Sequence, residues 1–119
     1  MKAPEQGRPD QLTGPAALVA CAVLTVVLEL VTCGCRFGLG LQSTRDTGWI
    51  SAFTFGFRIH HGYIGVLFIA VALLAISKAG FLRRLVIVVG AALLLSDLIH
   101  HFLVLWPLTG DPQFDIRYR

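Results

Sequence analysis

Two pairs of adjacent histidines and one aspartate are the side chains of this sequence best suited to chemistry. Asp97 precedes His100 and His101 within a long apolar stretch. His60 and His61 stand at the start of the preceding apolar stretch. Residues three and four apart lie on one face of a helix, so Asp97 should share a face with both histidines that follow it. Ionisable side chains in apolar spans are costly and usually functional, so we expect a binding site here.

These residue types are typical ligands of transition metals. Imidazole nitrogens and carboxylate oxygens bind Zn, Fe and Cu in proteins, and a divalent cation would offset the cost of burying carboxylates. The predicted ligands are His60, His61, Asp97, His100 and His101, with Glu29 and Arg58 as additional ligands or as residues that orient the ligands. Adjacent histidines on a helix point about 100° apart, so the sequence leaves open which member of each pair would bind directly.

The composition indicates the kind of structure that must position these side chains. The chain has 119 residues, of which 55% are hydrophobic and 14% are charged. This is too apolar for a soluble domain of this size. Three stretches are long enough to cross a bilayer core of roughly 30 Å, namely residues 15–33, 59–77 and 81–106. The prediction is a single all-α integral membrane domain, a small antiparallel bundle of three transmembrane helices between polar tails at 1–14 and 107–119.

Such a bundle would bring the candidate ligands into one shallow layer of the membrane. Successive spans alternate in direction, so the end of the first, the start of the second and the end of the third lie on the same membrane face. Glu29 shares a helical stripe with Cys33 and should face protein, where pairing with Arg58 is the alternative to metal ligation. Gly62 and Gly65 would let a neighbouring helix approach closely.

The segments outside the three spans are predicted to have structural roles. Trp49 and the three phenylalanines within residues 53–57 indicate a short segment lying in the membrane interface before the second helix. Pro107 is expected to end the third helix. The tail after it is expected to be a plain solvated terminus. The alternative is a tail that folds back and brings Asp111 or Asp115 to the site.

The charge distribution predicts an orientation and argues against one class of partner. Lys78, Arg83 and Arg84 crowd the short loop between the second and third spans, which favours the cytoplasmic side for that loop. We therefore expect a multi-pass protein of the cell membrane, with a cytoplasmic N-terminus and an extracytoplasmic C-terminus and site. The net charge is +3, but the basic residues form no continuous patch, so nucleic acid is not an expected partner.

Three functions remain open at the level of the sequence. The first is a metal site, with metal-dependent chemistry on a lipid-soluble substrate as one use of it. The second is a haem-binding redox subunit, in which haem b takes one histidine from each of two helices. The third is a structural or accessory subunit of a larger membrane complex, held together by a polar His–Asp network. Whether the protein is an enzyme stays undecided. The expected partners are membrane lipid and either further copies in a homo-oligomer or the subunits of a larger complex.

Overall fold

The computed structural model describes residues 14–76 and 80–118, and this part of the chain is helical without any strand, as predicted. The elements in chain order are α1 (Gly14–Cys33), the π-helical η1 (Gly34–Gly38), α2 (Ser43–Asp46), the 3-10 helix η2 (Gly48–Ala52), α3 (His61–Leu74), α4 (Phe81–Leu98), the π-helical η3 (Ile99–Leu105) and α5 (Trp106–Thr109). The predicted N-terminal tail lies outside the described residues, apart from Gly14.

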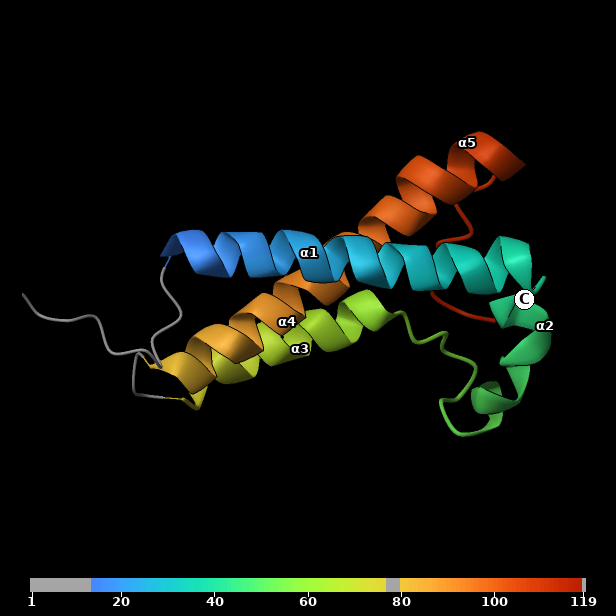
Figure 1. Ribbon diagram of the computed structural model, residues 1–119. Helices are drawn as coiled ribbons and strands as arrows, with labels where there is room; N and C mark the ends of the chain where they lie inside the picture. The colour runs from blue at the N-terminus through green and yellow to red at the C-terminus, as the bar shows by residue number, and fades with distance from the viewer. Residues whose placement is uncertain (1–13, 77–79, 119) are drawn as a thin grey trace, which may run out of the picture.

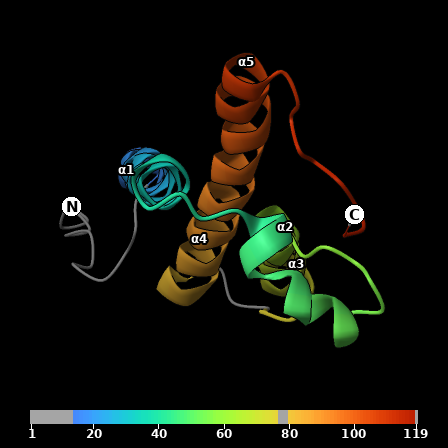
Figure 2. The same cartoon turned by 90° about the vertical axis from the view of Figure 1, so that its right-hand side faces the viewer.

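Helix α4 is the central element of the molecule. It packs against α1 along one side and against α3 along another, whereas α1 and α3 do not pack against each other within the described residues. Figures 1 and 2 show α4 crossing between the other two helices, with α3 running opposite to both α1 and α4. The C-terminal ends of α1 and α4 therefore lie at the same end of the molecule as the start of α3, as the alternation of the spans predicts.

Glycines allow α3 and α4 to pack with their backbones in contact. A Cβ atom added to Gly65 would clash with the carbonyl oxygen of Gly90, and one added to Gly90 would lie 2.6 Å from the carbonyl oxygen of Gly65. A Cβ atom on Gly62 would lie 2.6 Å from Oδ2 of Asp97. The close approach predicted for Gly62 and Gly65 is thus confirmed, and it brings the start of α3 against the acid of the predicted site.

Two helical runs are long and apolar enough, by length and composition alone, to cross a membrane. The first joins α1 to η1 over Gly14–Gly38 with a mean hydropathy of 2.4, and the second joins α4, η3 and α5 over Phe81–Thr109 with a mean hydropathy of 2.0. Only 6% of the most apolar window of the first run is buried inside the molecule. Its apolar side chains thus face outward, as they do not in the core helix of a water-soluble protein.

The second predicted span is shorter in the structure than the sequence indicated. Helix α3 has 14 residues, which at 1.5 Å per residue is about 21 Å and less than a bilayer core of roughly 30 Å. It begins only at His61 because the preceding backbone is extended and paired with the C-terminal tail. The backbone N–H of Arg58 donates to the carbonyl of Ile116 at 2.8 Å, and Phe57 forms an isolated β-bridge with Arg117.

The expectation that Pro107 ends the third helix is wrong. The helical run continues through Pro107 to Thr109 and ends at Gly110, which has a positive φ of 77°. Pro107 lies in the first turn of α5, where a missing N–H is tolerated. The preceding turn is π-helical, and the N–H of Trp106 donates to the carbonyl of His101. The hydroxyl of Thr109 then donates to the carbonyl of Leu105 at 2.7 Å.

Candidate functional site

Three buried side chains from the predicted set meet where α3 begins and α4 ends. Nδ1 of His60 lies 3.2 Å from Nε2 of His101. Oδ1 of Asp97 lies 3.8 Å from the first of these nitrogens and 3.6 Å from the second. The three residues are between 2% and 6% exposed. We call this group the NNO cluster, and its one carboxylate and two imidazoles could hold a metal ion.

The C-terminal tail folds back over the NNO cluster, so the expectation of a plain solvated terminus is wrong. His60 contacts the carbonyl oxygen of Asp115 through Nε2 at 3.0 Å. His101 contacts the carbonyl oxygen of Pro112 through Nδ1 at 2.7 Å. The ring of Phe114 stacks on that of His60, with centroids 4.4 Å apart. The tail therefore closes the outer side of the cluster with two carbonyl groups and an aromatic ring.

The two carbonyl contacts fix where the imidazole protons lie. A carbonyl oxygen only accepts hydrogen bonds, so His60 must carry a proton on Nε2 and His101 must carry one on Nδ1. In the neutral forms, the remaining nitrogens, Nδ1 of His60 and Nε2 of His101, then hold lone pairs. These two lone pairs and the Asp97 carboxylate face one another with no hydrogen between them. Three acceptors at such distances repel one another unless a cation lies among them.

The partner histidine of the first pair also reaches the acid, but from the rim. Nδ1 of His61 lies 3.2 Å from Oδ1 of Asp97, and the His61 side chain is 31% exposed. Its other ring nitrogen, Nε2, is buried and has no hydrogen-bond partner within the described residues. His61 is therefore suited to orienting Asp97, or to entering the ligand set from the open side.

Arg58 holds the C-terminal tail and is not one of the metal ligands. Its guanidinium donates to the carbonyl of Gln113 at 3.0 Å and lies 3.7 Å from a carboxylate oxygen of Asp115. Within the described residues Glu29 pairs with His100 at 2.9 Å and not with Arg58, which was the sequence alternative. Arg58 instead fixes the tail in the position where its carbonyls reach the histidines.

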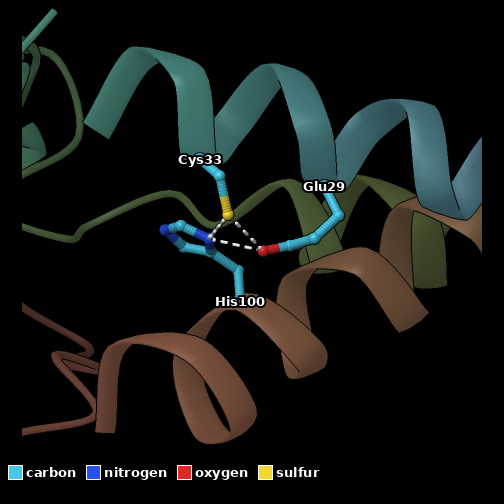
Figure 3. Close-up of side chains that lie close together, drawn as sticks. All are labelled: Glu29, Cys33 and His100. Carbon is cyan, nitrogen blue, oxygen red and sulfur yellow. Dashed lines mark hydrogen bonds and ion pairs between the residues drawn. The ribbon is translucent and has the colours of Figure 1, made fainter. Parts of the chain in front are cut away.

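His100, the sequence neighbour of His101, lies in a separate group, shown in Figure 3. Nδ1 of His100 lies 2.9 Å from Oε1 of Glu29, and the same oxygen accepts a hydrogen bond from the Cys33 thiol at 3.1 Å. We call Glu29, Cys33 and His100 the NSO cluster. The candidate ligands lie at the same end of the three helices, but the structure divides them into two clusters and not the single group that was predicted.

Adjacent residues of η3 serve these two clusters. His100 points toward α1 and His101 toward α3, because successive residues of a helix project in different directions and α4 lies between its two neighbours. Wide π-helical turns are frequent at functional sites, and η3 begins at the residue before this pair. The sequence missed Cys33 as a member of the site, although its spacing of four residues from Glu29 was the available signal.

A cavity of about 280 Å³ opens beside both clusters. Its lining includes all four histidines and Asp97. The opposite wall comes from η1 and the segment after it, with Arg36, Gln42 and Thr47 among the lining residues. A small polar molecule could enter this cavity and contact the NNO cluster from the side that the tail leaves open.

No protein family, curated protein or solved structure matches this chain.

Proposed function

We propose that this chain is an integral membrane protein that binds a divalent transition metal ion at the NNO cluster. The observation that carries the proposal is the pair of contacts between the two imidazoles and the tail carbonyls of Asp115 and Pro112. A carbonyl only accepts, so both histidines donate an N–H group outward, and in their neutral forms both direct an unprotonated nitrogen inward. Histidines that bind metals show this pattern, with the second N–H held by a carbonyl or carboxylate that fixes the tautomer.

The spacing of the three atoms suits a small cation. Nitrogen and oxygen ligands about 2.0–2.2 Å from a tetrahedral ion lie about 3.3–3.6 Å apart from one another. The separations in the NNO cluster are 3.2, 3.6 and 3.8 Å, so binding requires shifts of only a few tenths of an ångström. Two imidazoles with one carboxylate favour Zn, Fe or Cu over Mg or Ca, which prefer oxygen ligands.

An ion at this position would keep a coordination site facing the cavity. Three protein ligands and one open position are the arrangement of catalytic rather than structural zinc sites. A bound metal would act there as a Lewis acid on a molecule held in the cavity. The chain itself would hold that molecule against Arg36, Gln42 and Thr47, while Phe114 and the tail exclude water from the opposite side.

The membrane location rests on the outward-facing apolar surface. Helix α1 exposes large side chains along one side, and Leu18, Leu30 and Val31 are each at least 60% exposed. Contact of this apolar surface with lipid costs little free energy, whereas its exposure to water is unfavourable. The multi-pass topology, the extracytoplasmic site and assembly into a homo-oligomer or a larger complex are part of the same proposal and stay predictions.

A polar network without metal is the second candidate, and one observation favours it. A single extra proton shared between Nδ1 of His60 and Nε2 of His101 would turn their 3.2 Å contact into a hydrogen bond. The protein would then be a structural subunit whose helices are held together by buried polar contacts. The haem alternative has less support, because two nitrogens 3.2 Å apart leave no room for a haem plane between them.

Metal content separates the two candidates directly. We would purify the wild type in detergent without chelators and measure bound metal by inductively coupled plasma mass spectrometry beside His60→Ala and His101→Ala. The expected result is that each variant loses one equivalent of metal per chain. A visible spectrum of the same samples tests for haem through the Soret band.

Ser96→Ala is the matched control for this measurement. Ser96 is fully buried beside Asp97, and its hydroxyl has no hydrogen-bond partner within the described residues, so its removal should leave both folding and metal content unchanged. A wild-type protein without metal would overturn the metal proposal and favour the polar network.

A further inference from the structure

We propose that Glu29, Cys33 and His100 form a second metal site, chemically distinct from the first and selective for a thiophilic ion such as Zn²⁺. The three side chains come from two different helical elements, α1 and η3. Glu29 and Cys33 lie one turn apart on α1, and His100 faces them from η3 (Figure 3). None of these residues belongs to the NNO cluster, so metal binding at the second site can be tested independently of the first.

The distances within the NSO cluster fit a tetrahedral ion after small adjustments. The three ligand atoms are Oε1 of Glu29, Sγ of Cys33 and Nδ1 of His100. Their separations are 2.9 Å for oxygen to nitrogen, 3.1 Å for oxygen to sulfur and 4.0 Å for sulfur to nitrogen. Ligands at Zn–S of about 2.3 Å and Zn–N or Zn–O of about 2.0–2.2 Å would lie about 3.4–3.6 Å apart. Each separation is therefore within about 0.5 Å of the tetrahedral value.

The hydrogen bonding of Glu29 is incomplete in a way that a cation would correct. Oε1 is the oxygen contacted by both the thiol and the imidazole, whereas Oε2 is buried with no hydrogen-bond partner within the described residues. A buried carboxylate oxygen without a donor is costly. An ion bound at Oε1 would neutralise the whole carboxylate and remove most of that cost.

Binding exchanges one proton for the ion. The Cys33 thiol proton, which now bonds to Glu29, leaves to solvent, and sulfur binds the ion as a thiolate. Nδ1 of His100, which now donates its proton to Oε1 of Glu29, must lose that proton to bind the ion. A neutral His100 takes up a proton on Nε2 in exchange, so the ring releases no net proton. Thiolate, imidazole and carboxylate are each zinc ligands in proteins, whereas the NNO cluster offers no sulfur.

An ion at this site would also attach α1 more firmly to the rest of the molecule. Among the helical elements of the described residues, α1 packs only against α4, η1 and η3. The most apolar window of the run that contains α1 is 6% buried. An ion joining α1 to η3 at the end that carries the cavity would hold that cavity's wall of Thr32 and Arg36 in place. The second site would therefore support the first without sharing a ligand with it.

Cobalt titration tests this proposal with a signal that only sulfur produces. We would add Co²⁺ to metal-free protein in detergent and record the thiolate-to-cobalt charge-transfer band in the near ultraviolet together with the visible d–d bands. The wild type should bind two equivalents per chain and show the charge-transfer band. Cys33→Ser should bind one equivalent and lose the band, and His100→Ala should weaken it.

Three further variants make the result specific. Cys21→Ser and Cys35→Ser should each keep the band, because neither thiol belongs to the NSO cluster. His101→Ala should lose one equivalent of Co²⁺ but keep the band, which distinguishes failure of the first site from failure of the second. A wild type without a charge-transfer band, or a band that survives Cys33→Ser, would overturn the proposal.

Discussion

At the scale of single residues, the candidate centre depends most on Asp97. Its Oδ1 atom lies within 3.2–3.8 Å of nitrogens from three histidines, and the residue is 2% exposed. A carboxylate buried this deeply needs positive charge nearby. Its position is set by Gly62, which leaves just enough space on α3 for the carboxylate to fit. The absence of a side chain at one residue thus controls the placement of another.

Gly62→Ala should therefore damage both the fold and the site. The new Cβ would lie 2.6 Å from Oδ2 and 3.0 Å from Cβ of Asp97, so α3 must move away from α4. We expect a loss of about 1–3 kcal/mol in stability, the usual cost of overpacking, and reduced metal content. Thermal unfolding in detergent and metal analysis measure the two effects. Gly34→Ala is the control, because its Cβ would meet no atom within 4 Å. Equal melting temperatures for the two variants would contradict this account.

The sequence predicted the three members of the NNO cluster as part of one larger ligand set, but not the division of that set or the surroundings of the cluster. The spacing from Asp97 to His101 and the alternation of spans were enough to bring His60 to the same end of the molecule. The sequence could not show that His100 turns toward α1, because that depends on the central position of α4. Nor could it predict the contacts of the tail with His60 and His101, since they use backbone carbonyls, which carry no sequence signal.

At the scale of elements, the tail after Gly110 is part of the site. Its backbone forms a bridge with the segment before α3 and supplies the carbonyls that hold both histidines. Phe114 packs against His60, His101 and Phe102 and fixes the tail over the cluster. The extended conformation of residues 57–60 depends on this pairing, which explains why α3 begins at His61 and not at Ile59.

Removing the tail should weaken metal binding without removing a ligand. A chain that ends at Asp111 lacks the carbonyls of Pro112 and Asp115, so the imidazoles lose their fixed tautomers and orientations. Loss of such outer contacts typically costs 10–100-fold in metal affinity, and competition with a chelator of known affinity measures it. Arg117→Ala is the control, because it removes only a cation–π contact with Phe57 and a bond to the Phe55 carbonyl. Unchanged affinity in the truncated chain would show that the tail does not orient the ligands.

At the scale of the whole molecule, the arrangement of the helices explains why the site lies at one end. The two long runs point the same way, and the shorter α3 runs in the opposite direction along α4 (Figure 1). All the candidate ligands therefore gather where α1 ends, α3 begins and α4 ends, while Arg83 and Arg84, in the first turn of α4, lie at the opposite end. In a membrane, this polarity places the cavity near one surface, within reach of solutes on that side only.

Reporter fusions in a bacterial host test which side that is. Alkaline phosphatase is active only outside the cytoplasm, and green fluorescent protein matures poorly there. We expect phosphatase activity and no fluorescence when the reporters follow residue 119, because the basic loop should stay in the cytoplasm and the last run should cross the membrane. Fusions after Gly80 should give the reverse result and serve as the control for insertion. If both positions report the cytoplasm, α4 does not cross the membrane, and the outward-facing apolar surface must be covered by protein instead of lipid.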